Sequence, residues 1–384
     1  MTSLARAVQN LGRSGPVLRE ASASGNLKVL ASLLGPAYRG MVRQQARGAR
    51  STAMPAAHEA SFDWSYLRDR PQLARLYEAA KSSQWNAATD LDWSTSVDPL
   101  DPEHPLIPEE FHPISTTAAW RTLSPLERMK ERHDLLAWLL SQSLHGEQGA
   151  LFAACQVTEA VPWLDAKLYG SSQVADEGRH VEVFHGYLTR KLEKLYEIND
   201  NLYTIVDALM TDSRWDMKFL GMQIMIEGLA LGAFATFRQI TGEPLLRQLL
   251  TRVITDEARH VHFGVLALRE FFQGLTERER REREDWAFEV SLLLRNRFLA
   301  WEFYDEHWAH AFTRAEWERL SVASKLMGSF RQTMFKRIVP NLKSIGLLSD
   351  RIRPRYDSLG LLAYETGRAA PELTARDLLE DRSG

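Results

Sequence analysis

Two five-residue phrases, Asp-Glu-Gly-Arg-His at 176–180 and Asp-Glu-Ala-Arg-His at 256–260, repeat one arrangement of charged side chains. Residues three apart in a helix lie on one face, so the Glu and the His of each phrase point the same way. A carboxylate and an imidazole directed at one point form a suitable half-site for a transition metal such as iron. The repeat therefore predicts two metal half-sites.

Two further acids stand at matching distances before the phrases. Glu147 lies 30 residues before Glu177, Glu227 lies 30 residues before Glu257, and both Glu147 and Glu227 lie in apolar runs. Acidic side chains are rarely buried unless they are paired or bind a metal. We therefore expect both acids to join a shared site.

The turns between these residues indicate whether the side chains can meet. Two residues on adjacent antiparallel helices reach one height only where the turn falls midway between them. Pro162 stands at the first midpoint, and the run Thr241–Pro244 contains the second. Proline favours the first turn of a helix, and glycine often follows a helix end. The sequence thus predicts two helical hairpins and one layer of six metal ligands: Glu147, Glu177, His180, Glu227, Glu257 and His260.

Two lone glutamates and two Glu-x-x-His pairs are the ligand set of ferritin-like di-iron carboxylate proteins. Residues 124–272 resemble that superfamily, and the form Asp-Glu-x-Arg-His is similar to its oxygen-activating members: multicomponent monooxygenase hydroxylases, acyl-carrier-protein desaturases and N-oxygenases. The resemblance implies an all-α fold, a ferritin-like four-helix bundle with flanking helices and an irregular N-terminal segment. It also implies a cofactor of two iron ions, with a mixed manganese–iron centre as the alternative.

The same resemblance gives roles to the other charged residues of the phrases. A metal-bound histidine usually donates its outer ring N–H to a carboxylate, which fixes its tautomer. Asp176 and Asp256 would accept these hydrogen bonds, and Arg179 and Arg259 would pair with the aspartates. The alternative is that all four are ordinary charges on helix surfaces.

A further Glu-x-x-His pair, Glu182 and His185, lacks both the preceding Asp and the Arg before His. Glu182 follows Glu177 by five residues, which is about 140° round a helix. We therefore expect this pair to face outward, away from the metal ligands.

The implied activity is that of a non-haem di-iron oxygenase, which uses O2 to hydroxylate, N-oxygenate or desaturate a small, largely apolar organic substrate. Small residues beside the ligands would leave room for the substrate, and larger apolar residues would form a wall. Close helix packing is the alternative reading of the small residues. The candidate pocket residues are Gly146, Ala150, Leu151, Phe184, Ala230 and Leu231.

Electrons for such a reaction must come from outside, because the chain has no Cys-x-x-Cys pair, flavin fingerprint or glycine-rich nucleotide loop. We therefore expect an external electron-transfer protein or reductase as a partner. Two other functions stay open. One is a ferroxidase or iron-handling protein, although such chains are usually shorter. The other is a radical-generating subunit like that of ribonucleotide reductase, which Phe184 disfavours because a tyrosine usually stands four residues after the first metal-bound histidine.

Composition sets outer limits on function. The 384 residues carry a net charge of −3 and are 45% hydrophobic, which is ordinary for a soluble globular protein and gives no sign of a nucleic-acid partner. The single cysteine excludes an internal disulfide framework and a cysteine-rich metal site. No uninterrupted apolar run approaches the roughly 20 residues of a membrane span. We expect a cytoplasmic protein without a transmembrane segment, with a homodimer as one possible assembly.

The first sixty residues are basic and poor in acids, which is typical of an organellar transit segment. That reading would place the protein in an organellar matrix. The alternative is an arm in which residues 27–34 form a short helix that docks on the rest of the protein.

Five regions are expected along the chain. They are the basic segment 1–60, a wrapping segment 61–123 with a helix near 70–82 and a proline-rich loop, the bundle 124–272, accessory helices in 273–345 and a polar, loose tail 346–384. The bundle helices are predicted near 124–159, 162–195, 213–240 and 243–272, with a crossover helix near 201–210. The accessory helices are predicted near 281–312 and 314–338, and the charged run 277–284 is expected to face solvent.

Overall fold

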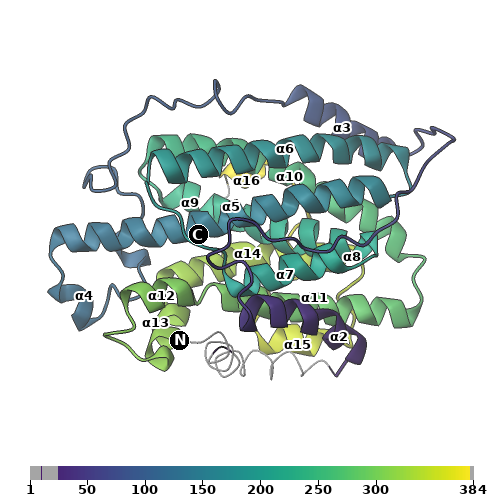
Figure 1. The fold of residues 1–384 in the computed structure, drawn as a ribbon. Helices are drawn as coiled ribbons and strands as arrows, with labels where there is room; N and C mark the ends of the chain where they lie inside the picture. Colours follow the sequence, from purple (N-terminus) through teal and green to yellow (C-terminus); the bar gives the residue numbers. More distant parts are fainter. Residues whose placement is uncertain (1–9, 11–24, 381–384) are drawn as a thin grey trace.

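The computed structural model describes residue 10 and residues 25–380, and all regular secondary structure in this part is helical (Figure 1). The expected all-α fold class is therefore confirmed. Residues 1–9 and 11–24, which carry the first basic residues of the N-terminal segment, lie outside the described part, as do residues 381–384.

Two helical hairpins form the centre of the protein. Helix α5 (Pro125–Ala160) is followed by α6 (Leu164–Arg190), and α9 (Glu227–Ile240) is followed by α10 (Pro244–Phe272). Helix α5 packs along α6, α9 packs along α10, and α6 contacts α10. Figure 1 shows α5 and α6 side by side. Both turns therefore fall where the sequence predicts them.

Local side chains explain where these helices begin. Ser124 and Glu127 form a capping box at the start of α5, which satisfies two backbone N–H groups. Glu243 caps α10 by accepting hydrogen bonds from the backbone N–H groups of Leu245 and Leu246. Tyr187 near the end of α6 donates to the Glu243 carboxylate over 2.7 Å. This bond joins the end of α6 to the start of α10, so the two helices run antiparallel.

The expected helix 213–240 is one helical segment with a wide turn inside it. Helix α8 (Trp215–Phe219) leads into the π-helix η4 (Leu220–Ile226), which leads directly into α9. π-Helical turns are rare in proteins, and those that do occur often lie at functional sites. The segment Trp215–Ile240 has the length and hydropathy of a membrane span, and 89% of its most apolar window is buried inside the protein. The sequence predicts no apolar run long enough to span a membrane, whereas this one helix is long and apolar enough to do so.

Shorter helices cover the hairpins. Helix α3 (Pro71–Ser82) packs on α6 and α10, as Figure 1 shows for α6, and α7 (Asp200–Thr211) packs against α5. Helix α2 (Leu27–Ala37), continued by the π-helix η2 (Tyr38–Val42), packs on α7 and α11. Residues 27–37 thus dock as the arm alternative expects.

Minor elements are η3 (Glu109–Phe111), α4 (Ala118–Thr122), η5 (Leu362–Tyr364) and η6 (Ala370–Glu372).

The first accessory helix is shorter than predicted and begins earlier. Helix α11 (Glu277–Arg297) starts at a capping box of Thr276 and Glu279, and α12 (Trp301–His307) follows it. The predicted helix 281–312 is wrong because Ala300 adopts a left-handed backbone conformation, with φ of 50°, which an α-helix does not continue through. Helix α6 also ends at Arg190, five residues before the predicted limit.

The second accessory helix is likewise divided, and the tail beyond it is ordered. Helix α13 (Arg314–Ala323) and α14 (Lys325–Ser344) meet at Ser324, whose extended backbone ends the first and caps the second. Helix α14 continues through Pro340. The expectation of a polar, loose tail is wrong, because apolar residues after Pro340 enter the core. These include Leu342, Leu347, Ile352, Tyr356 and Leu361, and the later helices are α15 (Arg353–Ser358) and α16 (Ala375–Glu380).

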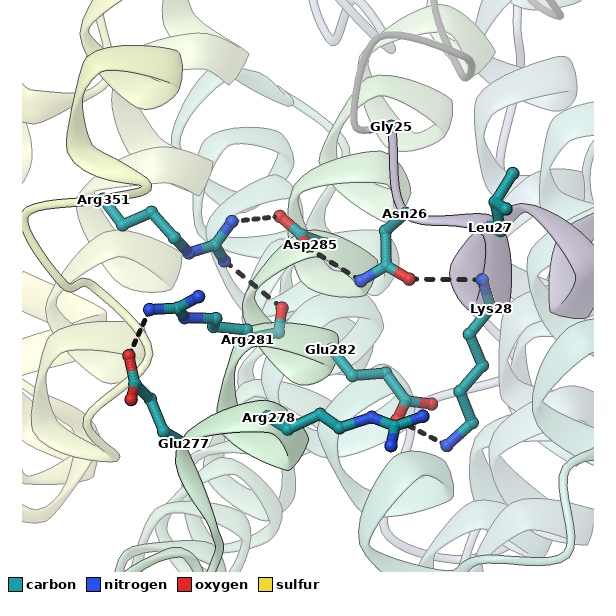
Figure 2. Close-up of a pocket in the computed structure, with 10 residues that line it drawn as sticks. All are labelled: Gly25, Asn26, Leu27, Lys28, Glu277, Arg278, Arg281, Glu282, Asp285 and Arg351. Atoms are coloured by element: carbon teal, nitrogen blue, oxygen red, sulfur yellow. Dashed lines mark hydrogen bonds and ion pairs between the residues drawn. The ribbon is translucent and has the colours of Figure 1, made fainter.

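The charged run at the start of α11 does not face solvent throughout. Glu282, Arg283 and Glu284 are buried, so the expectation is wrong for these three. Together with Asp285, and with Asp216 from α8, the two glutamates form the α11 acid cluster. Figure 2 shows Glu282 and Asp285 of this cluster. Each acid has a basic partner: Lys28 and Arg214 for Glu282, Arg283 for Asp216, and Arg351 for both Glu284 and Asp285.

Candidate metal centre

The six predicted ligands come together between the two hairpins. Glu147 and Glu227 each lie thirteen residues before the end of a helix, which is residue 160 in α5 and 240 in α9. Glu177 and Glu257 each lie thirteen residues after the start of a helix, which is residue 164 in α6 and 244 in α10. Because each turn has three residues, the ligands of each hairpin reach one level.

The ligand layer, defined as these four glutamates with His180 and His260, contains two groups with the spacing of metal donors. One ligand atom from each of Glu147, Glu177, His180 and Glu257 lies within 4.8 Å of the others. The same holds for Glu177, Glu227 and His260. Glu177 belongs to both groups, so the arrangement offers two adjoining cation positions with a shared carboxylate.

Both imidazoles direct Nδ1 at the carboxylates. His180 Nδ1 lies 3.3 Å from Glu147 Oε2 and 3.1 Å from Glu257 Oε1. His260 Nδ1 lies 3.0 Å from Glu177 Oε1 and 4.0 Å from Glu227 Oε2. The two ring centroids are 5.9 Å apart. The two imidazoles thus direct Nδ1 at the same group of buried carboxylates.

The outer nitrogens contact the aspartates in a crossed pattern. His180 Nε2 lies 3.3 Å from Asp256 Oδ2, and His260 Nε2 lies 3.2 Å from Asp176 Oδ2. Each phrase therefore supplies the aspartate for the histidine of the other phrase. An ionised carboxylate can only accept, so it favours the tautomer with the proton on Nε2 and a lone pair on Nδ1. That lone pair is what a metal ion requires.

The arginines of the phrases pair with the aspartates, as predicted. Arg179 bonds Asp176 on its own helix, and Arg259 bonds Asp256. Each arginine also reaches across to the other aspartate, at 3.7 Å for Arg179 to Asp256 and 3.6 Å for Arg259 to Asp176. These contacts show that the four residues are not separate surface charges but one network behind the imidazoles, in which Asp176, Asp256 and Arg259 are buried and Arg179 is half-buried.

Two neighbours in the wrapping segment complete this network. Trp85 Nε1 donates to Asp256 Oδ2 over 2.7 Å, and Gln84 Nε2 donates to Asp176 Oδ1 over 3.2 Å. Gln84 Oε1 also accepts from Arg179 over 2.6 Å. Sequence reasoning missed both roles, because helical spacing does not predict a partner as distant as Trp85, which lies 171 residues before Asp256.

Gln173 is a third residue that the sequence reasoning missed. Its Nε2 donates to Glu177 Oε1 over 3.1 Å and to Glu227 Oε1 over 3.0 Å. It precedes Glu177 by four residues, so it lies on the same face of α6. That spacing is a signal which could have identified it as a candidate.

The ligand layer is buried and contains more negative groups than its surroundings satisfy. All six residues are at most 4% exposed. Within the described residues, Glu177 Oε2, Glu227 Oε2, both Glu257 oxygens and His260 Nδ1 have no hydrogen-bond partner of acceptable geometry. A buried polar atom without a partner costs about 1–3 kcal/mol, and a charged one costs more. Such a concentration is rare in a folded protein unless another group binds there.

The pKa values reflect the same crowding. Burial and the neighbouring Glu257 carboxylate raise the pKa of Glu147 to about 8. Burial, then the charges of Glu177 and Glu257, raises the pKa of Glu227 well above its usual value. Burial acts to raise the pKa of Glu177 as well, but the two imidazoles lower it below the ordinary range. The carboxylates therefore compete for the few positive groups within reach.

The donor set matches two divalent cations in charge and chemistry. The four glutamates of the ligand layer would balance two such ions, while Asp176 and Asp256 balance Arg179 and Arg259. Carboxylate and imidazole donors without a thiolate suit iron or manganese. The residues present therefore fit the expected pair of metal ions.

The six candidate substrate-pocket residues are buried or half-buried beside the ligand layer. Gly146, Ala150, Phe184 and Leu231 are buried, and Leu151 and Ala230 are half-buried. A Cβ added at Gly146 would meet no atom within 4 Å, which indicates space beside Glu147. Phe184 stacks on Phe234 with ring centroids 5.3 Å apart. Three pockets in the described part of the chain are lined by other residues, and one of them, about 690 Å³, lies beside the α11 acid cluster (Figure 2).

The pair Glu182 and His185 faces outward, as predicted. Both side chains are exposed on α6, whereas Glu177 and His180 are fully buried. The Asp before Glu and the Arg before His thus distinguish, in the sequence, the buried Glu-x-x-His pair from the exposed one.

No known protein family matches the chain, and no curated protein is significantly similar to it. The ferritin-like superfamily expected from the motifs therefore stays a prediction.

Proposed function

We propose that this chain is a ferritin-like four-helix protein that binds two iron ions in its ligand layer and uses dioxygen to oxidise a small organic substrate. The observation that carries the proposal is the buried excess of carboxylates, several of whose oxygens lack hydrogen-bond partners among the described residues. Two divalent cations would remove that excess.

The ferritin-like part of the proposal is supported by the two matched hairpins. Helices α5 and α9 each supply one glutamate, and helices α6 and α10 each supply a Glu-x-x-His pair from antiparallel positions. This division of ligands over four helices is the one used by di-iron carboxylate proteins.

The protein's own residues would hold and orient the cofactor. Asp176 and Asp256 keep the imidazole lone pairs directed inward, and Gln84 and Trp85 hold the aspartates. When bound, iron would supply the activation of dioxygen, which no side chain performs. The buried apolar residues Phe184 and Leu231 would exclude water from the neighbouring space.

The substrate of this oxygenase would be small and largely apolar, because the candidate pocket residues are glycine, alanine, leucine and phenylalanine. Hydroxylation, N-oxygenation and desaturation are all compatible with such a pocket. An external electron-transfer protein or reductase would deliver the electrons.

A ferroxidase is the second candidate function. It is favoured by the observation that the measured pockets in the described part of the chain are not lined by the candidate substrate residues. A tyrosyl-radical subunit has less support. Phe184 occupies the expected tyrosine position, and the hydroxyl of Tyr187, one turn later, is engaged by Glu243.

Oxygen consumption by the iron-loaded, chemically reduced protein separates the two candidates. We expect small apolar amines or aromatic compounds to accelerate oxygen uptake, with an oxidised product formed in proportion to the oxygen used. Uptake that depends only on added ferrous iron, and that no organic compound accelerates, would contradict the oxygenase and support the ferroxidase. The Glu227→Ala variant is the control, because it removes a candidate ligand.

A further inference from the structure

Gln173 is placed between two carboxylates of the ligand layer. It lies on α6 one turn before Glu177, and its side chain is 1% exposed. The same Nε2 lies 3.1 Å from Glu177 Oε1 on its own helix and 3.0 Å from Glu227 Oε1 on α9. Because carboxylate oxygens accept, the amide nitrogen must face them, and the amide bridges two helices.

This bridge breaks the otherwise matched arrangement of the two hairpins. Each glutamate, histidine, aspartate and arginine of one phrase has a counterpart eighty residues later in the other. The counterpart of Gln173 is Val253, a buried apolar residue that cannot donate a hydrogen bond. Glu147 and Glu257 therefore receive no amide from the equivalent position.

The difference affects one cation position more than the other. The amide holds Oε1 of Glu227 and leaves Oε2 of the same group without a partner among the described residues. It thereby fixes which oxygen of Glu227 faces His260. Hydrogen bonds to ligating carboxylates orient them, and their loss usually lowers metal affinity about 10–100-fold.

We propose that Gln173 is a positioning residue for the cation position formed by Glu177, Glu227 and His260, and that it makes the two cation positions unequal. The inference rests on the proposed two-cation function. The amide orients Glu227, which belongs to this position alone. The other position shares Glu177 with it, but its own carboxylates, Glu147 and Glu257, receive no amide from Val253.

Cobalt(II) binding to the metal-free protein tests this assignment without measuring activity. His180→Ala should leave only the His260 position, and His260→Ala should leave only the His180 position. Gln173→Met, which keeps the length of the side chain but removes the amide, is then added to each variant. We expect affinity for Co²⁺ to fall about 10–100-fold in the His180→Ala background and to change less than about 3-fold in the His260→Ala background.

Two controls keep the test specific. Val253→Ala alters packing at the matching position of α10 and should weaken neither position selectively. Gln173→Asn retains an amide on a shorter side chain, should give an intermediate loss, and replaces Gln173→Met if circular dichroism shows that the latter does not fold.

Equal losses in the two backgrounds, or none in either, would overturn the role of Gln173 while leaving the two-cation function intact. Failure of the wild-type protein to bind Co²⁺ would overturn that function and this inference together.

Discussion

The ligand layer and the α11 acid cluster are both groups of buried acids on helices, and they differ in their supply of positive charge. In the α11 acid cluster, each acid has a lysine or arginine partner, such as Arg351 for Glu284 at 2.7 Å. In the ligand layer, the two nearest arginines bond Asp176 and Asp256 and leave the four glutamates to share two imidazoles. A buried carboxylate with a fixed cation supports the fold, whereas an excess of carboxylates provides a binding site for external cations.

The pKa values of individual glutamates follow this difference. Burial acts to raise the pKa of Glu282, but Lys28 and Arg214 lower it below the usual value. In the ligand layer, burial and neighbouring carboxylates raise the pKa of Glu147 to about 8. The pKa values of Glu147 and Glu282 therefore shift in opposite directions, and the pKa of Glu177 is lowered because it contacts both imidazoles.

Glu227→Gln should have the largest effect, because it removes one of the carboxylates in excess. Cation binding stabilises a protein by about 4 kcal/mol when the free ion is a thousandfold above Kd, and we expect most of this gain to be lost. The metal-free variant should be at least as stable as the metal-free wild type at pH 7, since less negative charge is buried. Thermal unfolding with and without ferrous iron measures both effects. Glu182→Gln, at an exposed site on α6, is the control.

A metal-free Glu227→Gln variant that is clearly less stable than the metal-free wild type would contradict the proposed excess of charge. It would indicate that Glu227 stabilises the fold through its own contacts, as the acids of the α11 acid cluster do.

The pH dependence of stability should come next in size. A carboxyl group with a raised pKa stabilises the folded state at low pH, and this contribution is lost as pH rises from 4.5 to the folded value. For Glu147 that window ends at about 8, and Glu227 acts in the same direction. We therefore expect metal-free protein to lose stability between pH 5 and 8, and metal-loaded protein to resist this loss. Denaturant midpoints across this range in a chelator and in excess cation provide the check; a metal-free protein that becomes more stable towards pH 8 would refute it.

Arg351→Ala should have a smaller effect and of a different kind. Breaking a fully buried ion pair costs about 3–5 kcal/mol, but Arg351 is about one-third exposed and solvent screening reduces the loss. We expect roughly 2 kcal/mol of lost stability from urea unfolding, with the number of bound cations unchanged. If added iron restored the stability of this variant, the α11 acid cluster would also bind cations, and its proposed difference from the ligand layer would be wrong.

The comparison also shows which features the sequence can predict. The ligand layer was predictable because helical spacing and the turn midpoints place Glu147 against Glu177, and Glu227 against Glu257, by local rules. The partners of the α11 acid cluster were not, because Arg351 lies 67 residues from Glu284. From its dense charges alone, the run 277–284 was expected to face solvent.

The tail and the helix breaks were missed for related reasons. The predicted helix 314–338 ends before Pro340, yet α14 continues through Pro340 to Ser344, and Leu342 is fully buried. The helix break at Ala300 depends on a left-handed backbone conformation, and the sequence has no glycine or proline at this position that would predict it. Tertiary packing decided both features.

The most direct test of the central claim is the number of metal ions bound to the ligand layer. Metal-free protein should be loaded anaerobically with ferrous iron, freed of excess metal and analysed for iron per chain. We predict two irons in the wild type and at least one fewer after His180→Ala or His260→Ala, with helical content largely retained. One iron or none in the wild type, or an unchanged count in these variants, would contradict the account.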